Sequence, residues 1–138
     1  MVCGMILPKQ WVSKRIMTKA DVEEIVKRYP FVIEAIKTGR EKAIFYIGNR
    51  KRCIEISEDV KAVCAIFDDI QSRETDKDVL CMMDGIKRGR RDLSIMQDVH
   101  WQKNAYYERK SRLVDKIFEC CILQGFVQYE EIMGRNIA

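Results

Sequence analysis

Polar side chains of the kinds that read base edges gather in the stretch HWQKNAYYERK, at Gln102, Lys103, Asn104 and Tyr107. The amides of Gln and Asn can pair with adenine, and the ammonium group of Lys can donate hydrogen bonds to guanine. A Tyr side chain can contact a phosphate group or the methyl group of thymine. These residue types, placed close together, indicate recognition of duplex DNA rather than catalysis.

Positive charge surrounds this stretch. Residues 87–112 carry eight Lys and Arg against three Asp and Glu, a net charge of +5, whereas the whole chain carries +4. The remainder therefore sums to −1, so the positive excess is local, as expected of a DNA-binding face. The residues that we expect to contact phosphates are Arg90, Arg91, Lys110 and Arg112.

Two helices are needed to position these side chains. We expect a short first helix within 91–99, a corner at 100–102, and a long second helix from Lys103 or Asn104 to Gln124, with Gly125 as its stop. Such a helix-turn-helix presents the N-terminal end of its second helix to base edges. The long helix is predicted to bury one stripe and to expose the opposite face. The stripe is Tyr106, Leu113, Ile117, Cys120 and Gln124, and the exposed face is Lys103, Tyr107, Lys110 and Val114.

The N-terminal half begins with signals for two short helices. Thr18 and Asp21 have the spacing of a capping box, so a helix should begin here. It should stop near Tyr29, because the residue before a proline is driven away from the helical region. Pro30 can then occupy the first turn of the next helix.

A hairpin and two further helices follow. Gly48-Asn49 suits the turn of a small β-hairpin within 43–56, with a continued helix as the alternative. Ser57 is a good cap for a helix over 58–71. Another helix runs through 79–86 and ends at Gly89.

These elements predict a mainly α-helical fold with a C-terminal helix-turn-helix and a small β-hairpin near 43–56. The expected organisation is an N-terminal arm (1–17), a helical bracing region (18–89) and a helix-turn-helix DNA-binding region (90–138). A chain of 138 residues is long enough to enclose a real core, so we expect these regions to form one compact domain.

The segment AYYERKSRLVDKIF, residues 105–118, carries a family resemblance. Residues 79–121 look like the region-4-type helix-turn-helix of sigma factors. In detail they are similar to small phage transcription regulators of the ArpU/RinA type, whose motif has a Tyr-Tyr pair, basic residues and then Arg-x-Leu. The resemblance implies a sequence-specific DNA-binding regulator of phage or prophage late genes, such as those for packaging or lysis.

Three residues depart from that family pattern. His100 stands at the corner in place of Gly, and His tolerates a positive φ better than most residues. Met96 replaces a small residue, which predicts a wider separation of the two helices. Arg109 replaces an apolar residue, so it must reach solvent or find a partner. Beside the corner, Trp101 is expected to fill the space between the helices.

Composition argues against several other classes. The chain has one His and six Cys without a C-x-x-C pair, so we expect neither a metal nor another cofactor, and we interpret the cysteines as buried apolar residues, with a metal or redox role as the lesser alternative. No apolar run approaches the ~20 residues that span a bilayer, and the N-terminal apolar patch is short for a signal peptide. We therefore expect no membrane partner and a cytoplasmic location.

The favoured partner is double-stranded DNA, with RNA polymerase and a second copy in a homodimer as further candidates. The alternative is a phage assembly or packaging adaptor, a protein-interaction module that uses the helix-turn-helix as a scaffold. An enzyme such as a nuclease is least favoured. The carboxylate pairs Glu23-Glu24, Asp68-Asp69 and Glu130-Glu131 lack an accompanying base or nucleophile, so they are interpreted as helix surface.

Overall fold

The computed structural model describes residues 17–124. Nearly all of the predicted N-terminal arm, the Gly125 stop and the Glu130-Glu131 pair lie outside the described residues. Within them, six helices and one two-stranded hairpin follow one another in the order α2, α3, β1, β2, α4, α5, α6 and α7. The prediction of a mainly helical fold with a small hairpin is confirmed.

Local capping signals fix the first two helices. Helix α2 (Lys19–Lys27) begins with the predicted capping box, in which the Thr18 hydroxyl accepts from the Asp21 amide at 3.2 Å and the Asp21 carboxylate accepts from the Thr18 amide at 2.9 Å. Helix α3 (Tyr29–Lys37) follows at once, with Pro30 in its first turn, as predicted.

The predicted hairpin is also present. Strands β1 (Lys42–Ile47) and β2 (Arg50–Glu55) are antiparallel, and Ile47 lies opposite Arg50, so Gly48 and Asn49 alone make the turn. Gly48 has φ +60°, whereas no other type of residue in the described chain has a positive φ, which is the pattern of a type II′ turn. This turn matches the right-handed twist of the strands and excludes the alternative of a continued helix.

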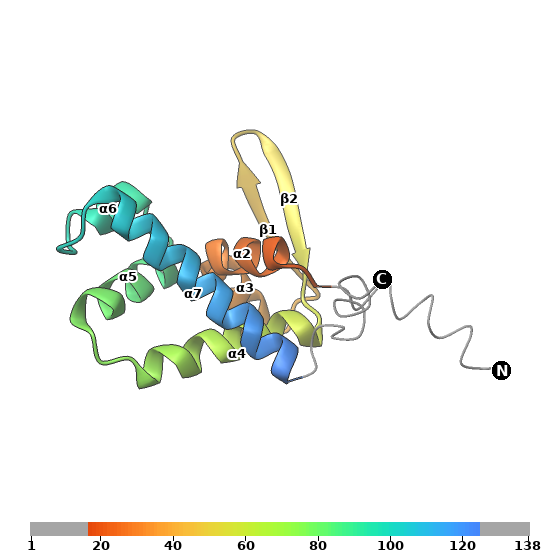
Figure 1. Ribbon diagram of the computed structural model, residues 1–138. Coiled ribbons are helices and arrows are strands. Elements are labelled where there is room, and N and C mark those ends of the chain that lie inside the picture. Colours follow the sequence, from red (N-terminus) through yellow and green to blue (C-terminus); the bar gives the residue numbers. More distant parts are fainter. Residues whose placement is uncertain (1–16, 125–138) are drawn as a thin grey trace, which may run out of the picture.

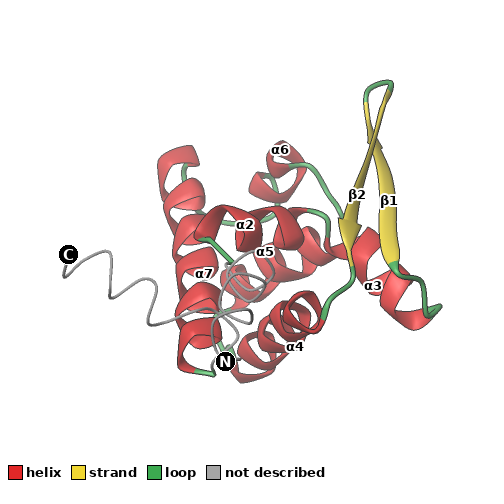
Figure 2. Cartoon of the chain, turned by 90° about the vertical axis from the view of Figure 1, so that its right-hand side faces the viewer, coloured by secondary structure: helices red, strands yellow, loops and turns green. Residues whose placement is uncertain are grey.

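Three longer helices build the rest of the body. Helix α4 (Glu58–Arg73) is capped by Ser57, and α5 (Lys77–Lys87) is capped by Asp76. The short α6 (Asp92–Met96) leads into α7 (Lys103–Leu123), which packs against both α2 and α4. Figure 1 shows α7 running from α6 along the helical body, while the hairpin extends beyond the helices. Figure 2 shows that only the base of the hairpin meets the body, at α3.

The helices enclose one hydrophobic core to which each of them contributes. Its largest fully buried side chains include Phe67 of α4, Met82 and Met83 of α5, Ile95 of α6, and Tyr106 and Ile117 of α7. The closest approach is that of α5 to α6. A Cβ atom added to Gly85 would lie 2.7 Å from a side-chain carbon of Ile95, so the absence of a side chain at position 85 sets the spacing of these two helices.

The predicted faces of α7 need a correction. The buried residues are Tyr106, Leu113, Val114, Ile117 and Cys121, so Val114, which was predicted to be exposed, lies in the core, and Gln124, which was predicted to be buried, is exposed. An α-helix turns by ~100° per residue, which places Lys110 and Val114 beside the Tyr106 stripe rather than opposite to it. Gln124 shares that stripe, but it is the C-cap residue of α7 and its side chain is not covered.

Candidate nucleic-acid interface

The corner between α6 and α7 is built without a left-handed residue. No non-glycine residue in the described chain has a positive φ, so His100 does not adopt the positive φ that its place at the corner suggested. The bend is spread over residues 97–102, and Val99 anchors it in the core with 8% of its surface exposed. Asp78 of α5 holds the far side of the bend: its carboxylate lies 3.1 Å from Nδ1 of His100 and accepts from the His100 amide at 3.4 Å.

A partly buried polar contact joins α6 to α7. Asp92, in the first turn of α6, accepts a hydrogen bond from the hydroxyl of Tyr106 at 2.7 Å and one from Nζ of Lys110 at 2.8 Å. Tyr106 is fully buried, so its hydroxyl depends on this carboxylate as a partner. We call Asp92, Tyr106 and Lys110 the Asp92 cluster.

Protonation in the Asp92 cluster follows from these contacts. Partial burial tends to raise the pKa of Asp92, but the hydrogen bonds from Lys110 and Tyr106 outweigh it, so the pKa is lowered. Burial, and next the hydrogen bond to Asp92, raise the pKa of Tyr106 well above its ordinary value. At neutral pH the cluster is therefore a carboxylate that accepts from an ammonium group and a neutral phenol.

A second set of polar contacts, made by Arg90, stabilises α6. The guanidinium group of Arg90 donates to the Asp98 carboxylate at 2.7 Å, to the Ser94 carbonyl at 2.9 Å and to the Ser94 hydroxyl at 2.8 Å. Arg90, two residues before α6 begins, thus bonds to residues within and after this helix. Arg90 and Lys110, both predicted to contact phosphate, have carboxylate partners within the protein, and their DNA contacts stay predictions.

Trp101 and Arg109 form the outer support of the corner. Trp101 is partly buried against the core, as expected of a residue that fills the space between the helices. The guanidinium carbon of Arg109 lies 4.7 Å from the centre of the Trp101 ring. The arginine that replaces an apolar family residue therefore pairs with an aromatic face and keeps its charge at the surface.

The N-terminal end of α7 brings together the residues predicted to read bases. Gln102, Lys103 and Asn104 are exposed, and Tyr107 is 41% exposed with its ring 5.2 Å from that of Tyr106. No side chain caps α7 and its first turn holds no acidic residue, whereas Thr18, Ser57 and Asp76 cap α2, α4 and α5. This end therefore presents unpaired amide groups and the positive end of the helix dipole to solvent.

Arg91 and Arg112 are both exposed, Arg91 before α6 and Arg112 in the middle of α7. Arg91 is the exposed N-cap residue of α6, and within residues 17–124 it has no ion pair, nor has Lys103. Arg112 is exposed and lies 2.7 Å from Glu108, one turn away on the same helix. Exposed pairs of this kind are weak, so Arg112 can exchange its carboxylate for a phosphate at little cost.

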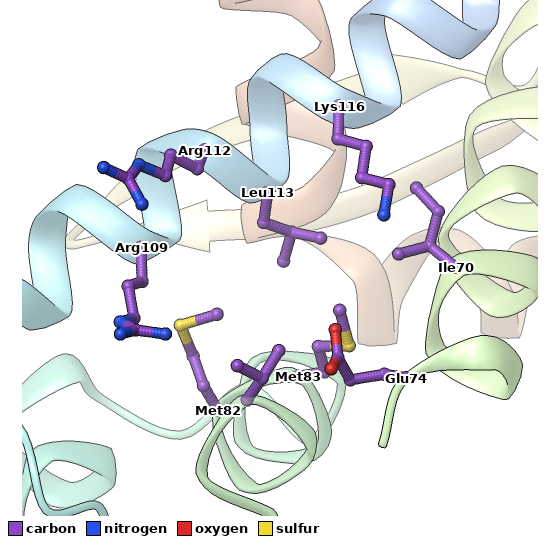
Figure 3. A pocket seen from close by; sticks show the side chains of 9 residues that line it. Ile70, Glu74, Met82, Met83, Arg109, Arg112, Leu113 and Lys116 are labelled. Carbon is purple, nitrogen blue, oxygen red and sulfur yellow. The ribbon is translucent and has the colours of Figure 1, made fainter. Parts of the chain in front are cut away.

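A pocket on another side of α7 was not foreseen from the sequence. It has a volume of about 150 Å³ and is lined by Ile70, Glu74, Val79, Met82, Met83, Arg109, Arg112, Leu113 and Lys116. Figure 3 shows Leu113 of α7 facing Met82 and Met83 of α5 across the pocket, with the cationic side chains of Arg109, Arg112 and Lys116 coming from α7. The lining comes from α4, α5 and α7, so no local pattern could reveal it.

Other kinds of site find little support in the described part of the chain. Between residues 17 and 124, no three His, Cys, Asp or Glu side chains are grouped so that they could hold a metal ion. Over the same residues, none of the helices has the length and apolar character needed to cross a bilayer. Comparison of the chain with protein-family models, curated proteins and solved structures gives no significant match. The geometry of α6 and α7 and the resemblance of their sequence are therefore the features that point to a function.

Proposed function

We propose that the protein is a sequence-specific DNA-binding transcription regulator of a phage or prophage, in which α6 and α7 act as a helix-turn-helix. The observation that carries this proposal is the exposed, uncapped N-terminal end of α7, with Gln102, Lys103, Asn104 and Tyr107 side by side. Helix N-termini attract phosphate groups, and in helix-turn-helix proteins they approach base edges. The Asp92 cluster supports the proposal because it joins α6 to α7, and Arg90 supports it because it stabilises α6 and the residues that follow.

The proposed roles divide between reading and positioning. Gln102, Lys103, Asn104 and Tyr107 contact bases, while Arg91 and Arg112 contact phosphates on either side. For Arg90 and Lys110, the intramolecular carboxylates favour a positioning role over the phosphate contacts predicted from sequence.

Regulation of late packaging or lysis genes is the part of the proposal that depends on the ArpU/RinA resemblance alone. RNA polymerase and a second copy of the chain are further proposed partners. In sigma factors, the comparable helix-turn-helix works beside polymerase, which makes polymerase the first protein to test.

The test is selection from a random pool of short duplexes, followed by titration of salt. We expect one motif to be enriched and log affinity to fall steeply with log salt concentration. Replacing Lys103 and Asn104 by Ala should cost ~1–3 kcal/mol per lost base contact and relax the motif. Lys61→Ala, on α4, is the matched control and should leave the motif unchanged. A pool without an enriched motif would contradict the proposal.

The pocket of Figure 3 favours a second candidate, a protein-interaction module such as a phage assembly or packaging adaptor. Its apolar floor and the cations Arg109, Arg112 and Lys116 suit a peptide with apolar and acidic residues. In that case Lys116→Glu, at an exposed position in the lining of the pocket, should abolish a stable protein complex, while DNA binding stays weak and insensitive to salt.

A further inference from the structure

The β-hairpin is a feature that the proposed role of α6 and α7 does not use. It stands out from the helical body, and among the described elements only α3 makes extensive contact with it (Figure 2). Its base is well anchored: Phe45 is 3% exposed, with its ring 5.6 Å from that of Phe31 and under the guanidinium group of Arg28 at 4.6 Å. The outer half, from Tyr46 to Lys51, is exposed on both strands.

The hairpin is strongly basic. Residues 40–55 hold five Lys and Arg against two Glu, a net charge of +3, and Arg50, Lys51 and Arg52 follow the turn directly. The positive excess is therefore not confined to 87–112, as the sequence suggested, because the residues outside both segments sum to −4. Within the described chain, none of these five cations forms an ion pair.

The three tip cations surround the hairpin rather than marking one face. Successive side chains of a strand point to opposite faces, so Arg50 and Arg52 lie on one face and Lys51 on the other. Lys51 is paired across the strands with Tyr46, whose side chain is 65% exposed. The hairpin tip therefore has cations on both of its faces, so it can bind phosphate groups that approach from either side.

The hairpin projects toward the same end of the molecule as the start of α7. The turn of the hairpin and the N-terminal end of α7 lie toward the same end of the molecule, the upper end in Figures 1 and 2, while α4 lies toward the other end. In Figure 2 the hairpin and α7 flank the body on opposite sides. Two basic elements that point the same way from one body can contact one duplex at two places.

We propose that the hairpin is a second DNA-binding element, in which Arg50, Lys51 and Arg52 bind phosphates of the duplex whose major groove receives α7. The inference rests on the proposed DNA-binding function. The hairpin contributes affinity and orientation, because contacts to phosphate carry no direct sequence information. Cations on an exposed strand can also serve only to prevent edge-to-edge pairing with another chain, and the experiment separates these roles.

The experiment compares the triple variant Arg50→Gln, Lys51→Gln, Arg52→Gln with the wild type on the selected duplex across a range of salt concentrations. Three lost phosphate contacts should reduce the slope of log affinity against log salt by about 2–3, and lower affinity at 0.1 M salt on the order of a hundredfold. The enriched motif should not change. A matched control, Lys61→Gln, Arg73→Gln, Lys77→Gln, removes the same charge from exposed positions on α4 and α5 and should lower the slope far less.

Each outcome is decisive. A triple variant with the wild-type slope overturns the hairpin proposal and leaves the proposed function intact; if that variant also self-associates in size-exclusion chromatography, the cations protect the strand edges. A wild-type protein that binds no duplex overturns both proposals. The variant Arg50→Lys, Arg52→Lys keeps the charge and should keep the slope, and a loss equal to that of the Gln variant would assign the effect to altered structure. Circular dichroism of each variant confirms folding.

Discussion

The two basic regions of this protein use their charge differently. Five of the eight cations in 87–112, namely Lys87, Arg88, Arg90, Lys110 and Arg112, pair with carboxylates, whereas none of the five in 40–55 does so within the described chain. In the first region, Lys110 joins α7 to α6 and Arg90 pairs within the α6 segment, while the other three cations pair within or between α4, α5 and α7. The hairpin leaves all of its charge to solvent and is held only at its base. Net charge counted along a sequence therefore measures neither how much charge is accessible nor where it is.

The largest effect on the free energy of unfolding should come from a core residue of α7. Tyr106→Ala removes a fully buried ring and leaves Asp92 without a partner hydroxyl, which should destabilise the fold by ~3–5 kcal/mol. Tyr46→Ala removes an exposed ring from the hairpin and should cost less than ~0.5 kcal/mol. Urea unfolding followed by circular dichroism measures both. Equal losses would mean that the hairpin is as much part of the core as α7.

A smaller effect should appear at Asp92 and should depend on pH. The lowered pKa of Asp92 in the folded state means that its ionised form stabilises the protein above the pKa of ~3.9 that it has in the unfolded chain. This stabilisation is lost as the pH falls through the lowered value. Asp92→Asn should therefore cost ~1–2 kcal/mol at pH 7 and much less at pH 2.

The same unfolding measurement at the two pH values tests this expectation. Asp69→Asn is the control, since Asp69 pairs with Arg73 at the surface of α4, and its effect should be small at both pH values. If the cost of Asp92→Asn does not change with pH, the negative charge of Asp92 does not contribute to holding α6.

The smallest effect on stability should be that of Arg112→Gln, which separates surface charge from structural charge within α7. Its pair with Glu108 is exposed, so the free energy of unfolding should change by less than ~0.5 kcal/mol. The slope of log affinity for DNA against log salt should nevertheless fall by ~1 if Arg112 contacts a phosphate. A variant that unfolds at much lower urea concentration, with an unchanged slope, would place Arg112 among the structural cations.

Local signals in the sequence predicted most of the elements. Thr18, Ser57 and Gly48-Asn49 each fix a backbone conformation through neighbours a few residues away, and the helices and turn appear where those signals stand. The side chains at the start of α7 could likewise be foreseen as exposed, because they lie at the end of a helix.

What could not be predicted depends on contacts between distant segments. The inward position of Val114 follows from the ~100° turn per residue of an α-helix and could have been predicted, whereas the carboxylate partner of Lys110 is set by where α6 packs. The pairing of Asp92 with Tyr106 and Lys110, the pocket among α4, α5 and α7, and the projection of the hairpin have the same origin. Which cations pair with carboxylates and which stay unpaired is likewise decided by the tertiary structure.

The missing side chain at position 85 has a consequence for how this protein can evolve. Since Ile95 occupies the space that a Cβ atom would need, any larger residue there pushes α6 away from α5, and the Asp92 cluster passes that displacement to the start of α7. If the residues at the start of α7 read bases as proposed, they can change with the target sequence, while the glycine that sets their distance from the body cannot. Lineages with new binding preferences would be expected to share this glycine, although it touches no ligand.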